Sequence, residues 1–306
     1  MTIGFVRPDY PHERRVALLP ADLPTDVAQN LVVERGFGAH MDESDAAYAE
    51  RGCAIAGRDE VFAACDTVFS LKLIQPADYG RLRPGQAIVG WTHPLGSGRE
   101  FFDQVARPLG LRIFDIDNIT PRLYVGDQVT PLTWLPRNFI WGNSYLAGKA
   151  AVQHALQAHG TLAAHDLTSA VLGTGNVAQG AFAAIAGMGC EPRMFYRKTM
   201  GEFYALLPTF DVIVNGIEAD EPGMHILNRA QLAALKRSCL LIDAAADAGN
   251  AIEGSYYTGF DEPLGTVEGV TFYCVNNAPS LVYRTASRFI SSTVARWILP
   301  HLDRLA

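Results

Sequence analysis

A glycine-rich turn at residues 173–178 has the types and spacing of a phosphate-binding site. Gly173, Gly175 and Ala178 follow an apolar run and precede a segment with helical spacing. In a dinucleotide-binding fold the first glycine permits a tight turn, the second lets the backbone approach a pyrophosphate, and the third position must be small so that helix and strand pack closely. The N-terminal amides and dipole of the following helix then attract the phosphates. We therefore predict a dinucleotide site, the alternative being an ordinary glycine-rich turn, and its residues are Gly173, Thr174, Gly175, Asn176, Val177 and Ala178.

The residues after the next expected strand indicate which nucleotide is bound. An acidic residue at this place normally accepts hydrogen bonds from ribose hydroxyls and would repel a ribose 2′-phosphate. Here the sequence reads Tyr196-Arg-Lys-Thr199. Arg197 can form forked hydrogen bonds with a phosphate, Lys198 supplies a point charge and Thr199 supplies a hydroxyl. We expect NADP(H) as the cofactor, unless Arg197 and Lys198 are only a solvated pair in a loop.

Apolar runs on both sides of the turn predict α/β structure in two parts. Strands separated by segments of helical spacing form parallel sheets through right-handed crossovers. In the first part we expect strands at residues 4–6, 31–33, 68–71, 88–91 and 112–115. After Gly160 the alternation restarts, and we expect strands at residues 169–172, 193–196, 211–215, 239–243 and 271–275.

A helix at residues 143–158 is expected to carry the chain from one part to the other. Asn143 or Ser144 would cap its N-terminus. Small residues recur every four positions, so that one face can pack closely on a neighbour; they are Ala147, Ala151 and Ala155.

The predicted fold is α/β, with two Rossmann-like domains and a catalytic cleft between them. Residues 1–141 would form the substrate-binding and catalytic domain, completed by a C-terminal helix at 281–306, and residues 142–280 would form the dinucleotide-binding domain. A chain of 306 residues, 49% of them hydrophobic, is long enough for two such cores.

Charge and cysteine content exclude other classes of partner and site. A formal net charge of -7 and a pI near 5.6 disfavour a nucleic-acid partner, which requires a basic surface. The five cysteines lie far apart without metal-ligand or redox spacing, so we expect buried reduced thiols and no metal site. Because no segment has the length of a signal peptide's apolar region or of a membrane span, we expect a cytoplasmic protein without a membrane partner.

The N-terminal segment resembles the signature of the alanine dehydrogenase and transhydrogenase family. It reads Phe5-Val-Arg-Pro-Asp-Tyr-Pro-His-Glu-Arg-Arg-Val-Ala-Leu-Leu-Pro20, and Arg15 takes the place of the family's arginine before Val-Ala. The resemblance spans nearly the whole chain and continues at residues 69–76, 85–94, 147–148, 242–247 and 272–280. Four stretches are similar to short, opine-forming members of the family; they are residues 90–93, 193–200, 213–218 and 251–254.

This resemblance implies an NADP-dependent oxidoreductase that acts on carbon–nitrogen bonds. The implied reaction is reductive condensation of pyruvate with the side-chain amine of L-ornithine, or of L-lysine, giving N(5)-(1-carboxyethyl)ornithine from ornithine. By the same resemblance Arg15 and Lys72 would bind pyruvate, and His93 would protonate its carbonyl oxygen. Asp247 matches the family's catalytic aspartate and would bind the amine or relay its proton. The family also implies a homo-oligomer.

Each of these four residues has a simpler interpretation. Arg15 could belong to a surface ion-pair cluster with its neighbours, and Lys72 could extend from an apolar strand to solvent. His93, which precedes a proline, could be a turn histidine, and Asp247 could form an Asx turn. One departure bears on Lys72: alanine dehydrogenases carry a lysine two positions further on, where this chain has Ile74.

Two rival functions stay open. An alanine-dehydrogenase-like enzyme would use ammonia and favour NAD(H), which the residues Tyr196-Arg-Lys198 argue against. A non-catalytic NADP-binding module would need neither Arg15 nor His93. The residues that bind the α-amino acid end of the amine substrate are not identified by any motif, and the candidates by placement alone are Glu218, Asn276, Asn277 and Arg284.

Overall fold

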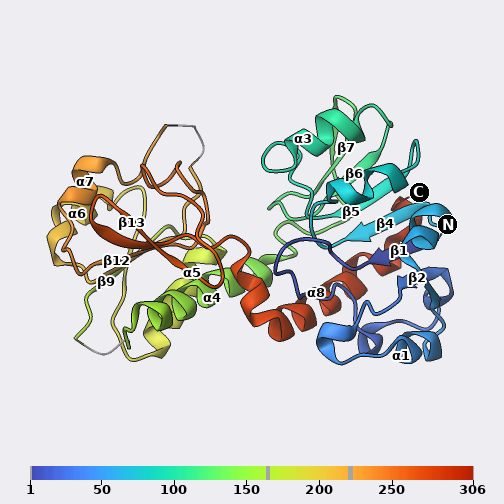
Figure 1. Ribbon diagram of the computed structural model, residues 1–306, viewed down its shortest axis with the longest axis horizontal. Coiled ribbons are helices and arrows are strands. Elements are labelled where there is room, and N and C mark those ends of the chain that lie inside the picture. The colour runs from blue at the N-terminus through green and yellow to red at the C-terminus, as the bar shows by residue number, and fades with distance from the viewer. Residues whose placement is uncertain (1, 163–165, 220–222, 306) are drawn as a thin grey trace. The chain divides into compact units, whose positions relative to one another are not determined.

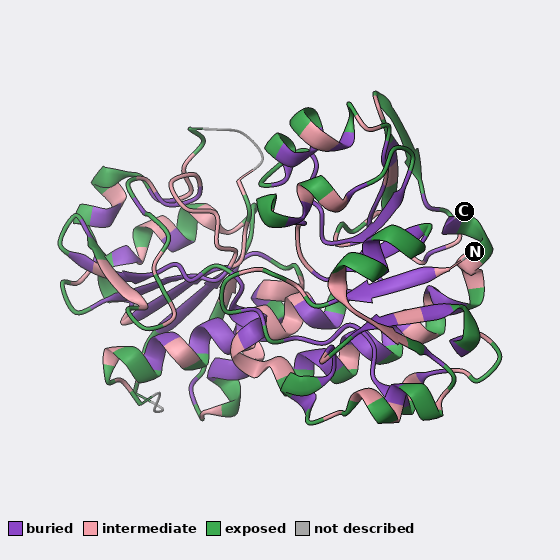
Figure 2. Cartoon of the chain, turned by 45° about the vertical axis from the view of Figure 1, so that its right-hand side comes forward, coloured by how far each residue is buried: buried purple, intermediate pink, exposed green. Residues whose placement is uncertain are grey.

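The chain folds into two α/β units, which confirms the predicted fold class. The computed structural model describes residues 2–162, 166–219 and 223–305. Unit 1 contains the residues up to Trp141 together with those from Tyr283 onward, and unit 2 contains Gly142–Val282 (Figure 1). In both units the strands are largely buried (Figure 2), as the apolar runs in the sequence require.

Unit 1 is built on an eight-stranded sheet in the order β3-β2-β1-β4-β5-β6-β7-β8. Strands β1 to β6 are parallel, and β7 and β8 add an antiparallel hairpin. The parallel part has the 3-2-1-4-5-6 order of a dinucleotide-binding fold. The strands are β1 (Ile3–Val6), β2 (Leu31–Glu34), β3 (Ala54–Ala56), β4 (Thr67–Ser70), β5 (Ala87–Gly90), β6 (Arg112–Asp115), β7 (Arg122–Val125) and β8 (Gln128–Pro131).

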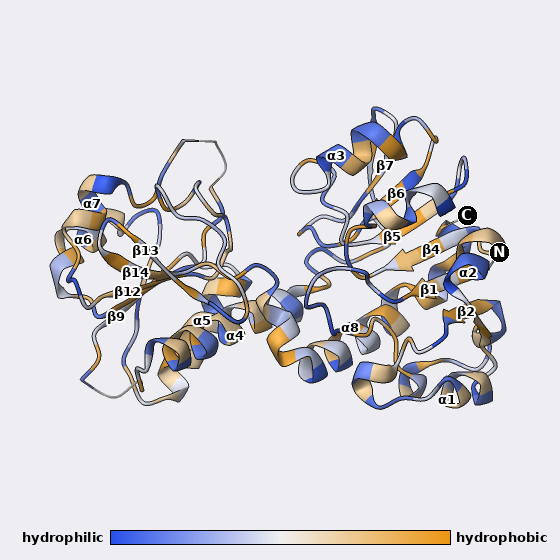
Figure 3. Ribbon diagram, viewed as in Figure 1, coloured by the Kyte–Doolittle hydropathy of each residue, from blue (hydrophilic) through white to orange (hydrophobic). Residues whose placement is uncertain are grey.

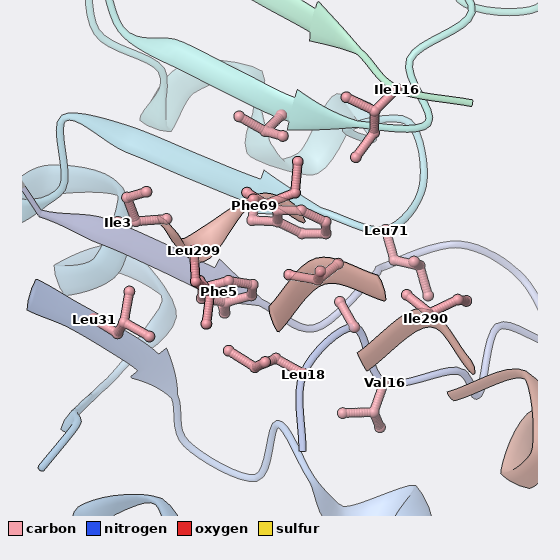
Figure 4. Close-up of a cluster of buried hydrophobic side chains, with 14 of the residues drawn as sticks. Ile3, Phe5, Val16, Leu18, Leu31, Phe69, Leu71, Ile116, Ile290 and Leu299 are labelled. Carbon is pink, nitrogen blue, oxygen red and sulfur yellow. The ribbon is translucent and has the colours of Figure 1, made fainter. Parts of the chain in front are cut away.

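Among the described residues of unit 1, four α-helices accompany this sheet, and the C-terminal one completes its core. They are α1 (Asp45–Glu50), α2 (Arg58–Ala64), α3 (Arg99–Phe101) and α8 (Tyr283–Trp297). Ile290 of α8 packs among side chains of the central strands, including Phe5 and Phe69, whose rings stack at 5.0 Å (Figure 4). Ser287 and Ser291 of α8 accept hydrogen bonds from the backbone N–H groups of Val16 and Leu19, each at 2.8 Å. Helix α8 therefore fixes the segment that follows Arg15.

Unit 2 is built on a six-stranded sheet in the order β10-β9-β11-β12-β14-β13. All pairs are parallel except β13 with β14. Figure 3 shows the hydrophobic character of these strands. The strands are β9 (Ser169–Leu172), β10 (Arg193–Phe195), β11 (Val212–Asn215), β12 (Leu240–Asp243), β13 (Leu264–Val267) and β14 (Val270–Tyr273). The helices are α4 (Trp141–His159), α5 (Asn176–Gly187), α6 (Met200–Ala205) and α7 (Arg229–Ala233).

The predicted start of helix α4 was wrong by two residues. The helix begins at Trp141, so that Asn143 lies buried inside it and neither Asn143 nor Ser144 is a cap. The chain is already turned by Asn138, whose backbone has a positive φ of 56° and whose carbonyl accepts the N–H of Trp141 at 3.0 Å. A cap at Asn143 was predicted from residue type alone. The turn from Asn138 to Trp141 starts the helix before Asn143 is reached.

Helix α4 packs closely on α5, but through glycines rather than through the predicted alanines alone. Ala151 and Ala155 are buried, whereas Ala147 is only half-buried. A Cβ on Gly148 would lie 1.9 Å from the carbonyl oxygen of Val177, and one on Gly180 would lie 1.9 Å from that of Tyr145. Because Val177 is in the first turn of α5, this contact sets the position of the helix end next to the glycine turn.

We predict that Gly148→Ala destabilises the protein by about 1–3 kcal/mol, the usual cost of overpacking, because the new methyl group meets a backbone atom that cannot move aside. The matched control is Gly201→Ala in α6, where an added Cβ meets nothing within 4 Å. That change should be neutral or stabilising by a few tenths of a kcal/mol, since alanine favours helix. Urea unfolding of both variants measures the difference, and equal stabilities would contradict the close contact.

Candidate active site

Unit 1 gathers its reactive side chains at the carboxyl ends of its parallel strands. Arg15 follows β1, Lys72 follows β4, His93 follows β5 and Asp117 follows β6. Ligands of open parallel sheets bind at this edge, where the strand order reverses, which here lies between β1 and β4. The charges of Arg15 and Asp117 act on Lys72, and that of Lys72 acts on His93, so the four groups form one electrostatic cluster.

Arg15 forms a buried ion pair with Glu13 rather than a surface one. Its Nη2 lies 2.6 Å from Glu13 Oε2 and its Nε 2.8 Å from Oε1, and only 2% of the residue is exposed. Glu13 Oε1 also accepts the backbone N–H of Arg15 at 2.9 Å. Such a two-point pair fixes the guanidinium plane and offsets much of its charge.

Lys72 lies next to Arg15 and beneath an aromatic ring. Its Nζ is 4.8 Å from the centre of the Tyr10 ring, a cation–π contact. Burial, and after it the charge of Arg15, lower the pKa of Lys72 to about 8, although the charges of Glu13 and Asp117 oppose the shift. The ammonium is therefore charged at neutral pH but poorly compensated, a state that favours binding an anion.

His93 is held in an uncommon backbone conformation. Its φ is 42°, and the buried carboxylate of Asp115 accepts the N–H groups of Thr92 and His93 at 3.2 and 3.3 Å and the Thr92 hydroxyl at 3.1 Å. The His93 carbonyl in turn accepts N–H groups from Gly96 and Gly98, each at 3.0 Å. His93 is thus a turn residue, and Asp115 fixes the direction in which its ring leaves the turn.

The imidazole of His93 has a carboxylate partner. His93 Nε2 lies 3.1 Å from Asp117 Oδ2. Burial alone would lower the pKa of His93, but the hydrogen bond with Asp117 and the charges of Asp117 and Asp115 outweigh it, so the pKa is raised. A histidine that keeps its proton near neutral pH is suited to act as a general acid.

Several residues of this cluster were missed from the sequence. They are Tyr10, Glu13, Asp115 and Asp117. For Asp115 and Asp117 a signal existed. They lie at the end of the expected strand 112–115, which follows the expected strand 88–91 that precedes His93. Carboxyl ends of neighbouring parallel strands lie at one edge, so these carboxylates could have been placed beside His93.

In unit 2 the glycine turn has the geometry that a pyrophosphate requires. Gly173 has a φ of 100°, and a Cβ there would lie 2.9 Å from Ile217, whereas an added Cβ on Gly175 meets nothing within 4 Å. Ala178 is fully buried and packs against Gly216. Helix α5 starts directly after Gly175 and has no side-chain cap. The N-terminal amides of α5 and the open backbone at Gly175 therefore fit a dinucleotide, and Thr174 and Asn176 lie within the same turn.

The predicted phosphate-binding cations lie beside this turn. The carbonyl of Phe195, at the end of β10, accepts the N–H of Gly173 at 2.8 Å. Arg197 and Lys198 follow directly, are exposed, and form no ion pair with any residue in the described part of the chain. Thr199 instead closes the local turn, because its hydroxyl accepts the N–H of Tyr196 at 2.9 Å.

Asp247 ties two loops of unit 2 together. Its Oδ2 accepts the N–H of Ala219 at 2.8 Å, and its Oδ1 accepts the side-chain amide of Asn250, also at 2.8 Å. The backbone carbonyl of Asp247 accepts the N–H of Asn250 at 3.1 Å, so a local turn is present as well. Each carboxylate oxygen retains a lone pair for an ammonium group.

The remaining candidates lie in different places. Arg284 belongs to unit 1, where it pairs with Asp42 at 2.6 Å. Glu218 follows β11, while Asn276 and Asn277 follow β14, and Asn277 has a φ of 67°. All five cysteines are buried free thiols. Within residues 2–162, 166–219 and 223–305, no three His, Cys, Asp or Glu side chains are grouped as metal ligands, and no helix has the length and apolarity needed to cross a membrane.

Comparison with known proteins assigns both units. Residues 5–122 match the N-terminal domain of alanine dehydrogenase/PNT, and residues 142–304 match the C-terminal domain. An N(5)-(carboxyethyl)ornithine synthase of Clostridium botulinum is 46% identical over 97% of this chain and 94% of its own length. A Lactococcus lactis protein of the same name is 43% identical over 96% and 94%. A solved L-alanine dehydrogenase shares the fold, with a TM-score of 0.82 at 17% identity over 99% of this chain and 90% of that one. The chain therefore belongs to the alanine dehydrogenase/PNT family of oxidoreductases, which bind nicotinamide nucleotides.

Proposed function

We propose that this protein catalyses the NADPH-dependent condensation of pyruvate with the side-chain amine of ornithine, giving N(5)-(1-carboxyethyl)ornithine, with lysine as a second candidate amine. The strongest support is the 46% identity to a protein named N(5)-(carboxyethyl)ornithine synthase over nearly the full length of both chains. Arg197 and Lys198, which form no ion pair with any residue that the structure describes, support the choice of NADPH. The five buried thiols are compatible with a reducing compartment, which supports a cytoplasmic location.

In unit 1 the proposed roles follow from charge. The Lys72 ammonium binds the pyruvate carboxylate, and Arg15, oriented by Glu13, adds positive potential at the same strand edge. The amine nitrogen attacks the carbonyl carbon, and His93 gives its proton to the carbonyl oxygen, which becomes a hydroxyl. The attacking nitrogen then releases a proton to His93, and His93 passes it to the hydroxyl, which leaves as water when the imine forms. Asp117 keeps His93 protonated for this step. Asp115 acts through His93, because it orients the turn from which the ring projects.

In unit 2 the proposed roles concern binding. The amides at the start of α5 hold the pyrophosphate, and Arg197 and Lys198 hold the 2′-phosphate. When bound, NADPH supplies the hydride that reduces the imine carbon. Asp247 binds the substrate amine as an ammonium and takes up its proton, and the bonds from Ala219 and Asn250 fix its carboxylate for that task.

An ammonia-using alanine dehydrogenase, the rival function, would be expected to carry a second lysine two positions after Lys72. Alanine dehydrogenases carry a lysine where this chain has Ile74, and Ile74 is 2% exposed among the apolar side chains Val6, Leu82 and Ile88. A charged group at this position would have to be buried in that cluster at high cost. This chain therefore has one candidate lysine at the end of β4, which favours the synthase over the rival.

The proposal predicts that NADPH oxidation by the purified protein needs pyruvate together with ornithine or lysine. Parallel reactions replace the amino acid with ammonia or omit it, and mass spectrometry identifies the secondary amine product. Oxidation with ammonia alone would favour the amino-acid dehydrogenase. If no amine supports oxidation while NADPH still binds, the non-catalytic module is favoured.

Arg197→Ala should weaken NADPH binding by about 10–100-fold, the loss of a charged hydrogen-bonded pair, while NADH binding stays unchanged. Titration of protein fluorescence with each nucleotide measures this. Arg193→Ala is the matched control, since Arg193 is an exposed arginine of β10, the strand before Arg197, and already pairs with Glu202 at 2.5 Å. Equal losses for NADPH and NADH would show that Arg197 does not contact the 2′-phosphate.

The KM for pyruvate should rise as the pH passes upward through about 8, the pKa of Lys72, because the lowered pKa makes the ammonium lose its proton there. Above that pH we expect the KM for pyruvate to increase about tenfold per pH unit. Lys72→Arg should remove this rise, since a guanidinium stays charged. Initial rates at saturating ornithine and NADPH give the KM at each pH. A variant that keeps the wild-type alkaline rise would assign it to another group.

A further inference from the structure

Asp243 is a buried carboxylate in unit 2 to which the proposed reaction gives no role. It is the last residue of β12 and is fully buried. Three hydrogen-bond donors point at it. Asn215 Nδ2 lies 2.9 Å from Oδ1, the backbone N–H of Asp247 lies 3.2 Å from Oδ2, and the thiol of Cys274 lies 3.5 Å from the same oxygen. The donors come from β11, from the loop after β12 and from the end of β14.

Two of these three groups, the Asn215 side-chain amide and the Asp247 N–H, can act only as donors toward Asp243. The side-chain amide of Asn215 is fixed at both ends by Ile217, because Nδ2 donates to its carbonyl at 2.9 Å and Oδ1 accepts its N–H at 3.1 Å. The N–H of Asp247 is a backbone group and can only donate. Asp243 therefore has to be an acceptor on both oxygens, which the ionised carboxylate satisfies.

The hydrogen bonds of Asp243 reach the nucleotide-binding turn. Asn215, which donates to Asp243, also fixes the backbone of Ile217, and the Ile217 side chain lies next to Gly173. Through Asp247 they reach Ala219, because the Asp247 carboxylate accepts the N–H of that residue at 2.8 Å. The loop after β11 is thus held from both sides by groups that depend on one buried carboxylate.

We propose that Asp243 is a positioning residue whose ionised carboxylate holds the loops after β11 and β12 in the arrangement that binds the nicotinamide nucleotide. This extends the proposed function, on which it rests for the identity of the ligand. A protonated Asp243 is a poorer acceptor for the N–H groups of Asn215 and Asp247 than the carboxylate, because hydrogen bonds to an ionised acceptor are stronger. The loops are then held less firmly, and nucleotide affinity falls.

The direction of the pH dependence follows from the surroundings. Burial raises the pKa of Asp243 to about 6, although its bonds with Asn215, Cys274 and Asp247 oppose the shift. The other titratable groups that face it are Asp247, whose negative charge adds to the shift, and Cys274, whose own pKa burial raises so that the thiol stays neutral. Affinity should therefore be full above about pH 6 and decrease as the pH falls below it.

The test is a fluorescence titration of the full-length protein with NADH from about pH 5 to about pH 8, on either side of that pKa. NADH is the probe because the 2′-phosphate of NADPH itself titrates near pH 6, as phosphate monoesters do; NADPH is titrated in parallel. The wild-type Kd should rise about tenfold between the plateau and one pH unit below the pKa. Asp243→Asn should bind weakly without this pH dependence, whereas Asp261→Asn, an exposed carboxylate of the same unit, should behave as wild type.

A second measurement needs no nucleotide. In hydrogen exchange of the protein alone, the amides of Ala219 and Asp247 should be protected in the wild type and lose protection in Asp243→Asn, while amides of β1 and β4 in unit 1 stay protected. If that variant fails to fold, Asn215→Ala replaces it, with weaker nucleotide binding expected. Unchanged protection or a wild-type pH curve in the folded variant would overturn the role of Asp243. A protein that binds neither nucleotide would overturn the proposed function, and the exchange result would still decide about Asp243.

Discussion

A carboxylate buried at the last position of a strand organises the loop beside each proposed site. Asp115 ends β6 and Asp243 ends β12, and both are fully buried. Because burial of a carboxylate is costly, each must be matched by donors, and backbone N–H groups supply them, from His93 in one unit and Asp247 in the other. His93 has a φ of 42° and Ala246, which precedes Asp247, a φ of 54°. Such conformations persist where the surroundings determine them, and the buried carboxylates provide that restraint.

In unit 1, neighbouring charges shift the pKa values of His93 and Lys72 and so prepare the two residues for different roles. Asp115 and Asp117 lie beside His93 and raise its pKa, whereas half-burial and the charge of Arg15 lower the pKa of Lys72. The pKa values of His93 and Lys72, which follow neighbouring strands of one sheet, are thus shifted in opposite directions. The histidine keeps a proton that it can donate, and the lysine has a charge that an anion would stabilise. In the proposed reaction, proton donation falls to His93 and anion binding to Lys72 because of their neighbours and not because of residue type alone.

The parallel strands could be predicted from the sequence because they are buried on both faces and give continuous apolar runs. Residues 112–115 and 169–172 are strands with the predicted ends, and most others differ by one residue. Strand β3, the hairpin of β7 and β8, and strand β13 were missed. Strands β3 and β8 contain no buried residue, and β7 and β13 contain one each, so they give no continuous apolar run to detect. Close packing of the helix at residues 143–158 on a neighbour was predicted from its alanines. The neighbour is α5, and the contact occurs through Gly148 and Gly180, since only glycine lets two backbones approach so closely.

The site could be predicted as far as each residue is marked by its own motif. The glycine turn fits its predicted geometry, and Lys72 and His93 lie at one strand edge. Neighbouring strand ends indicate that Asp117 lies near His93, but the atoms that meet in this pair, and in the pair of Arg15 with Glu13, depend on side-chain directions that no local pattern encodes.

The absence of a lysine at position 74 can now be understood physically. Ile74 is in the apolar cluster beneath the sheet edge, whereas Lys72, two positions earlier, reaches Tyr10 and the charges of Arg15 and Glu13. A lysine at 74 in this setting would be desolvated without a counter-ion. In the proposed reaction, the substrate carboxylate is therefore bound by Lys72, and no lysine at position 74 could replace Lys72 if its charge were removed.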